Sequence, residues 1–257
     1  MITMTRARTM ALAGLLLAAC VPSAVPAQDL FSTLSSAHFD VHYQRGVTPE
    51  EARKVMEYLQ SQYKSLETDL GLQLKTKLDV RIYESVGKFL SETTLKRPWR
   101  GALYQRGVLH LQPVSALLQR KMFDKSIGYE MAIAFLEESG QKGCPRWLLE
   151  SFASYYSGET AGMTPPLGAR LTAFSDLNQD IQEYPNPPQR DDVHYILAST
   201  MTFLVQSYGE KKAFRVYREF DGATGVDRVF KKVFGDEYST IEKGWAKYIA
   251  SRTASFK

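Results

Sequence analysis

Cysteine and histidine are both scarce in this chain, which has two cysteines and four histidines among 257 residues. If Cys20 is lipidated or cut away with a leader, Cys144 is left alone and cannot form an intrachain disulfide. A nucleophilic role for Cys144 is also disfavoured, because it precedes Pro145 at a predicted helix start and has no histidine nearby in sequence. We interpret Cys144 as a small apolar residue at a turn.

An excess of charge of one sign is absent as well. The 32 Lys and Arg residues face 28 Asp and Glu residues, so the formal net charge is +4. Arg6 and Arg8 lie in the predicted leader, and 4 minus these 2 leaves +2 for the remaining chain. No basic cluster stands out from this background, which argues against a nucleic-acid partner. We interpret the Lys and Arg residues as a solvated surface.

Long apolar runs are confined to the amino terminus, where residues 1–28 are predicted to be a targeting segment. The run Ala11–Ala19 is too short to span a bilayer. Two cleavage sites compete. A Leu-Ala-Ala-Cys sequence ending at Cys20 fits a bacterial lipoprotein box with Cys20 lipidated, and a Val-Pro-Ala sequence ending at Ala27 fits ordinary signal cleavage. Both predict export, as a periplasmic or outer-membrane lipoprotein or as a secreted protein.

The period of the apolar residues changes along the chain. Alternating apolar and polar side chains predict strands at 39–43 and 78–82, and glycine-containing turn residues predict a hairpin over 101–111. Between the first two strands, the sequence Thr48-Pro49-Glu50-Glu51 is a capping box that begins a helix, and Gly71 ends that helix. The first part of the chain is therefore expected to form a small sheet with helices on it.

The second part is expected to be nearly all helical, apart from an irregular stretch over 164–190. Its later helices are predicted at 114–123, 192–208, 210–220 and from a cap at Ser239. The fold class is α+β: a small mixed sheet with helices over 37–112, then a mostly helical part over 113–250. We assign both parts to one domain, because the helices on either side of the irregular stretch would share a core. Residues 28–36 are predicted to be a flexible tether.

The stretch 126–158 is predicted to form two apolar helices joined by a tight turn, and each helix carries a conspicuous acid. Glu130 lies in the first helix and Glu150 in the second. Burying an unpaired carboxylate costs several kcal/mol or forces the group to take up a proton. We therefore expect these acids to face a cleft or to be paired. The pairing would be through a shared proton or with Arg100, Arg146 or a tyrosine hydroxyl.

Two short sequences on the second helix suggest a family. Pro145-Arg146-Trp147-Leu148-Leu149-Glu150 and Ala153-Ser154-Tyr155, together with the order of sheet and helices, resemble the peptidase MA-like proteins of the gluzincin group of zinc metallopeptidases. The resemblance covers about residues 39–249 and implies a zincin-like fold. The family's active helix carries HExxH, whose histidines bind zinc and whose glutamate is the general base. A glutamate on the next helix is the third zinc ligand.

The segment that matches HExxH here is Tyr129-Glu130-Met131-Ala132-Ile133, and no other HExxH occurs in the chain. Glu130 stands at the position of the general base and Glu150 at that of the third ligand. Tyr129 and Ile133 replace the two histidines. Isoleucine has no lone pair and a neutral tyrosine is a weak ligand, so the resemblance implies the fold without zinc or peptidase activity. The glycine that often follows the third ligand in the family is Ser151.

For a member without activity, we expect binding to an unknown protein or to a component of the cell envelope. Its contact with a membrane would be only through a lipid on Cys20. A purely structural domain is a further reading, in which Tyr129 and Ile133 fill the space once used by metal and substrate.

The alternative is an active hydrolase with a non-standard metal site, in which His110 or His194 joins Glu130 and Glu150. Tyr195, next to His194, could then point toward the same cleft, since a tyrosine often steadies the oxyanion in active relatives. The other two histidines, His38 and His42, lie on a predicted strand roughly 13 Å apart, too far to share one metal ion. We interpret them as a solvated or edge-facing pair.

Overall fold

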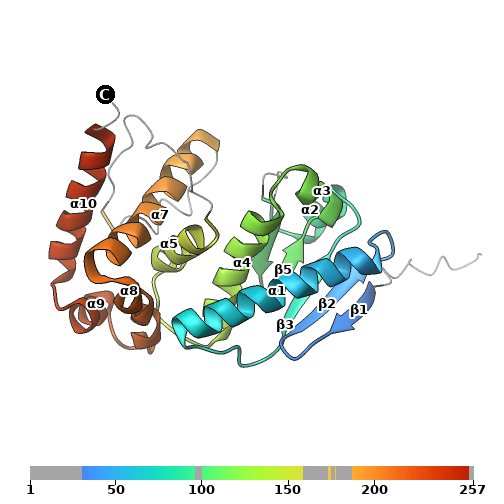
Figure 1. Ribbon diagram of the computed structural model, residues 1–257, viewed down its shortest axis with the longest axis horizontal. Helices are drawn as coiled ribbons and strands as arrows, with labels where there is room; N and C mark the ends of the chain where they lie inside the picture. The colour runs from blue at the N-terminus through green and yellow to red at the C-terminus, as the bar shows by residue number, and fades with distance from the viewer. Residues whose placement is uncertain (1–30, 96–99, 159–172, 175–176, 178–186, 255–257) are drawn as a thin grey trace, which may run out of the picture.

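The computed structural model describes residues 31–95, 100–158, 173–174, 177 and 187–254 (Figure 1). The predicted leader with Cys20, and most of the predicted irregular stretch over 164–190, lie outside these residues.

A mixed five-stranded sheet forms the first part of the fold, as predicted. Its strands are β1 (Phe31–Ser35), β2 (Phe39–Gln44), β3 (Leu78–Ile82), β4 (Ala102–Gln105) and β5 (Val108–Leu111). They lie in the order β1-β2-β3-β5-β4, so β1 and β4 are the two edges. The three central strands run parallel, and each edge strand pairs antiparallel with its neighbour.

Strand β1 corrects the prediction of a flexible tether over 28–36. Its sequence, Phe-Ser-Thr-Leu-Ser, is rich in small hydroxyl side chains, and in isolation it reads as a linker. In the fold it pairs with β2 residue for residue, from Phe31 opposite Gln44 to Ser35 opposite Asp40. The hydrogen bonds that order this segment come from the neighbouring strand β2. The pattern of side chains within the segment therefore could not predict that it forms a strand.

Helix α1 (Pro49–Leu70) connects β2 to the parallel strand β3, a connection that needs a crossover element. The predicted capping box is present: the Thr48 hydroxyl accepts from the Glu51 amide, and the Glu51 carboxylate accepts from the Thr48 amide. The helix ends at Gly71, whose φ of 61° is a left-handed conformation that glycine adopts without strain. Local signals thus set both ends of α1.

The helices that follow lie beside and beyond the sheet. They are α2 (Val86–Glu92), α3 (Val114–Gln119), α4 (Phe123–Glu138), α5 (Arg146–Tyr156), α7 (Pro187–Tyr208), α8 (Glu210–Arg215), the 3-10 helix η1 (Val216–Glu219), α9 (Val226–Phe234) and α10 (Tyr238–Ala254). Figure 1 shows α4 between the sheet and α5, with α7 to α10 on the far side of α5. The α+β class is therefore correct.

Several predicted helix bounds are wrong. The helix expected over 114–123 ends at Gln119, and a turn in which Lys121 adopts φ of 53° separates α3 from α4. The helix expected to begin at residue 192 begins at Pro187, and Ser239 lies inside α10 instead of capping it. The helix expected over 210–220 continues beyond Arg215 as the 3-10 helix η1. Apolar periodicity locates the middle of a helix better than its ends.

One connected set of buried apolar side chains extends from β2 to α10. It includes the inward-facing side chains of the sheet, such as Val41, Val80 and Leu109, and side chains of the last helix, such as Trp245. Within the part of the chain that the structure describes, no helix has the length and apolar character needed to cross a bilayer.

Candidate functional site

Apart from Glu130, the middle of helix α4 is free of charged side chains on every face, so it can only be stable where it is covered on every side. All ten residues from Ile127 to Leu136 are buried, and α4 contacts both β4 and α5. Glu130 lies in the middle of this segment and is 2% exposed. A charge at such a position has to be compensated by nearby groups.

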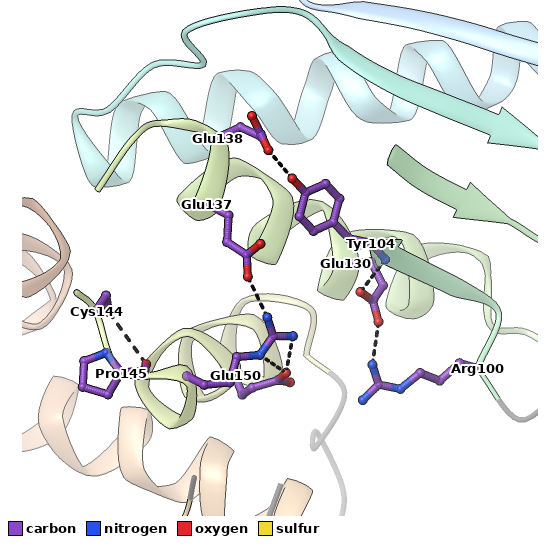
Figure 2. Close-up of polar contacts among 9 residues, drawn as sticks. Arg100, Tyr104, Glu130, Glu137, Glu138, Cys144, Pro145 and Glu150 are labelled. Atoms are coloured by element: carbon purple, nitrogen blue, oxygen red, sulfur yellow. Dashed lines mark hydrogen bonds and ion pairs between the residues drawn. The ribbon is translucent and has the colours of Figure 1, made fainter. Parts of the chain in front are cut away.

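The compensation for Glu130 comes from a guanidinium and a backbone amide (Figure 2). One Glu130 oxygen accepts from Arg100 Nη1 at 2.8 Å, and the other accepts from the Tyr104 amide on β4 at 2.9 Å. The Arg100 backbone is itself held, because its carbonyl accepts from the Gln112 side chain at 2.8 Å, and Gln112 in turn accepts from Arg120 at 2.8 Å. Arg100, one of the two residues that bind Glu130, is therefore held in turn by Gln112 and Arg120.

Glu150, on the first turns of α5, is 3% exposed and also binds an arginine. Arg146, four residues earlier on the same helix, donates to one Glu150 oxygen from Nε at 2.7 Å and lies 2.6 Å from it through Nη2. A third nitrogen of Arg146 donates to Glu137 of α4 at 2.6 Å. Burial raises the pKa of Glu137, and the Arg146 guanidinium opposes that rise. Arg146 therefore links α5 to α4 as well as neutralising Glu150. Figure 2 labels its two partners, Glu137 and Glu150.

Of the alternatives left open for the two acids, the structure shows pairing with arginine, Glu130 with Arg100 and Glu150 with Arg146. Sequence reasoning missed the contribution of Tyr104. Its backbone amide binds Glu130, and its hydroxyl donates to Glu138. Nothing in the residue types signals the first contact, because every residue except proline has an amide. The spacing of Glu130 and Glu138, two helical turns apart, was the one available sign that both face the same neighbour.

Tyr129 and Ile133, which stand where an HExxH sequence would have its histidines, are both buried, at 4% and 0% exposure. The Tyr129 ring lies 5.7 Å from the His194 ring of α7, and the Arg100 guanidinium carbon lies 5.5 Å from the centre of the Tyr129 ring. The hydroxyls of Tyr129 and of Ser154 on α5 are buried without a hydrogen bond in the described residues. Tyr129 thus has an imidazole and a guanidinium next to its ring, and Ile133 is completely buried.

His110 lies on the other face of the sheet from α4. Along β5 it alternates with Leu109, whose register partner Tyr104 donates its hydroxyl to Glu138 of α4, so Leu109 faces α4 and His110 faces the opposite side. Its Nδ1 is 2.7 Å from the Tyr83 hydroxyl, and the two rings are stacked. Burial, followed by the charge of Arg81, lowers the pKa of His110 to about 4. The fold does not bring His110 to the two acids.

The other candidates from the sequence are placed in different surroundings. His194 lies beside Tyr129. Its neighbour Tyr195 is instead influenced by Arg252 and Tyr248 of α10, although burial is the main cause of its raised pKa. Successive residues of a helix point in different directions, so the two side chains reach different neighbours.

The two amino-terminal histidines make separate contacts. His38 stacks on Tyr63, with ring centres 3.8 Å apart. The Nδ1 of His42 is 2.9 Å from the Thr33 hydroxyl, and its Nε2 is 3.7 Å from Asp79. The two histidines thus contact different residues, and both are half-buried.

Ile133 and Glu150 stand at positions that would be zinc ligands in an HExxH protein, so their surroundings bear on zinc binding. Ile133 offers no donor atom, and the Glu150 oxygen that faces Arg146 is already bound by a cation. Among the residues with described positions, no group of three or more His, Cys, Asp or Glu side chains is arranged to hold a metal ion. What the arrangement can do chemically is hold two buried carboxylates in their charged form beside fixed guanidinium groups.

Comparison with known proteins adds no family assignment: no protein-family model matches the chain, and no curated protein matches it significantly.

Proposed function

We propose that this protein is an exported, peptidase MA-like member of the gluzincin group that has lost zinc peptidase activity. It would serve as a binding or accessory protein in the cell envelope, with an unknown protein or envelope component as its partner. The observation that carries the proposal is the use of both acids as salt-bridge partners, Glu130 with Arg100 and Glu150 with Arg146. A general base must be near a metal-bound water, and a zinc ligand must offer its oxygen to the metal.

The packing around the two acids supports the loss of activity. Tyr129 and Ile133 are buried where the family has histidines, and they fill the space next to Glu130 with a ring and a hydrocarbon side chain. This packing also fits a purely structural domain whose former site is filled by its own side chains. The order of a small mixed sheet, then α4 with one buried acid, then α5 with another, supports membership of the family.

One observation favours the alternative, an active hydrolase with a non-standard metal site. His194 of α7 lies against Tyr129, so an imidazole is present next to the segment that matches HExxH. A site of Glu130, Glu150 and His194 would need both carboxylates to leave their arginines. Zinc binding that is abolished by His194→Ala would establish this alternative.

The first experiment measures zinc in the purified protein and titrates it with zinc by calorimetry. We expect no stoichiometric zinc and no peptide hydrolysis. Stoichiometric zinc that is lost in Glu130→Gln and Glu150→Gln variants would overturn the proposed loss of activity.

A second experiment tests the family itself by restoring the two missing ligands. In the double variant Tyr129→His/Ile133→His, the imidazoles and Glu150 would converge only if α4 and α5 have the gluzincin arrangement. We expect the double variant to bind zinc at least ~100-fold more tightly than either single variant, because each first-shell ligand matters more than a second-shell partner. Equal affinities for the double and single variants would argue against the family.

Export is part of the proposal and rests on the leader sequence alone. Mass spectrometry of the mature amino terminus distinguishes a lipid-modified Cys20 from cleavage after Ala27. An unprocessed amino terminus in the native host would contradict export.

A further inference from the structure

Strand β4 is an outer strand of the sheet, and its free edge meets Glu130. In an antiparallel pair, residues alternate between those whose backbone groups bond the neighbouring strand and those whose groups point outward. The Gln112 amide bonds the Gly101 carbonyl, so Gly101 and Gln112 form a pair of the bonded type. Because the types alternate, the pairs Leu103–His110 and Gln105–Val108 are also of the bonded type. The Tyr104 amide therefore points away from β5, and Glu130 accepts it at 2.9 Å.

An outward-pointing amide on an edge strand is a place where another strand can pair. We propose that Glu130 works as an edge lock: its carboxylate occupies the outward amide of Tyr104 and so closes β4 to a further strand. This role depends on the contacts around Glu130 and not on the proposed family. It gives the buried carboxylate a use that needs neither metal nor substrate.

The contacts around the lock hold it in position. The Arg100 guanidinium binds the second Glu130 oxygen, which keeps the carboxylate charged and fixes its rotation. The Tyr104 hydroxyl donates to Glu138, two turns further along α4. Helix α4 therefore contacts the edge strand at two points: Glu130 binds the Tyr104 backbone amide, and Glu138 binds the Tyr104 hydroxyl. Only the first of these occupies a group that strand pairing would need.

Amide hydrogen exchange of the full mature chain, followed residue by residue by NMR, tests the lock directly. In Glu130→Ala we expect the Tyr104 amide to exchange roughly 10- to 100-fold faster beyond any acceleration that all protected amides share through a lower global stability, as fits the loss of a hydrogen bond to a charged group. The amides of Leu103 and Gln105, which bond β5, should change much less. In Glu130→Gln the side-chain oxygen can still accept, so the Tyr104 amide should stay protected.

Two control variants separate the lock from general loosening. Glu138→Gln alters the second contact with Tyr104, and Glu150→Gln alters the buried acid of the neighbouring helix. Neither should accelerate exchange at Tyr104 by more than it does at Leu103. An unchanged Tyr104 rate in Glu130→Ala would overturn the proposal, and so would an equal acceleration at Leu103, Tyr104 and Gln105.

The closing function is tested by sedimentation of the same variants at matched concentration. We expect Glu130→Ala to associate with itself through the opened edge, whereas the wild type and Glu130→Gln sediment as the smaller species. If the Tyr104 amide is freed in Glu130→Ala and no association follows, the helix and not the carboxylate closes the edge, and the lock is refuted.

Discussion

Two buried acids on neighbouring helices are neutralised in different ways. Glu130 is bound by Arg100 and by the Tyr104 amide, 30 and 26 residues away in the sequence. Glu150 is bound by Arg146, four residues earlier on its own helix. Both carboxylates are almost fully buried, yet the first depends on the sheet being in place and the second receives an arginine as soon as α5 forms.

The difference matters for stability. A contact between residues four apart on a helix is made whenever the helix is, so its partners are close even before the chain is packed. A contact across 26 to 30 residues exists only in the folded protein, so its loss leaves isolated charged and polar groups in the interior. We therefore expect the folded state to depend more on Glu130 than on Glu150.

The largest expected effect comes from removing the Glu130 carboxylate. Glu130→Ala leaves the Arg100 guanidinium and the Tyr104 amide without that acceptor, and we expect the free energy of unfolding to fall by about 3–5 kcal/mol. Glu130→Gln should cost less, since its amide oxygen still accepts one bond. Urea denaturation followed by circular dichroism measures both. A smaller loss in Glu130→Ala than in Glu150→Ala would break the comparison.

A smaller effect is expected at Arg146, whose side chain is 40% exposed. Arg146→Met strands the buried Glu150 and also the half-exposed Glu137, and we expect a loss of about 1–3 kcal/mol, reduced by solvent screening. Arg146→Lys should recover part of it, because lysine keeps the charge but not the planar fork. The same denaturation series checks this ranking, which fails if Arg146→Met costs as much as Glu130→Ala.

His110 extends the comparison to the outer face of the sheet. Burial lowers its pKa from 6.5 to about 4, so between these values the unfolded chain binds more protons than the folded one. Stability from this group is therefore present above pH 6.5 and is lost as the pH falls toward 4. We expect an effect on the order of 1 kcal/mol after screening.

The matched variant for this pH effect is His110→Gln, which can still bond the Tyr83 hydroxyl but does not titrate. Thermal unfolding at several pH values measures the stability of both proteins. As the pH falls, the wild type should lose more stability than the variant. The pH range from 7 to 4 is chosen because the pKa of His110 falls from 6.5 to about 4 on folding. A stability difference that stays constant over this range would refute the assignment to His110.

The smallest effect is expected beside the ion pair, at the Tyr129 hydroxyl. It is buried without a hydrogen bond in the described residues. Removing such a group relieves a desolvation cost, so Tyr129→Phe should leave stability unchanged or raise it by up to about 1 kcal/mol. Ser154→Ala removes a second hydroxyl of this kind and is the matched control. A loss above about 1 kcal/mol in Tyr129→Phe would reveal a bonded partner of the hydroxyl.

Much of the fold was predictable because its signals are local. The capping box at Thr48 and the glycine at the end of α1 are short-range devices, and the alternation in β2 and β3 follows from one face being buried. Strand β1 was missed because its order comes from pairing with β2. The break between α3 and α4 was missed because Lys121 takes a left-handed conformation that its residue type does not announce.

The sequence by itself determined that two acids would sit on two apolar helices, and the cost of burying charge required that each find a partner. For Glu150 the partner followed from the spacing to Arg146, because residues four apart share a helix face. Only the tertiary structure decided that the Tyr104 amide would bind Glu130 and that His110 would lie across the sheet from both acids. The direction in which a backbone amide points at a sheet edge is set by the register of strand pairing, and the residue types do not specify that register.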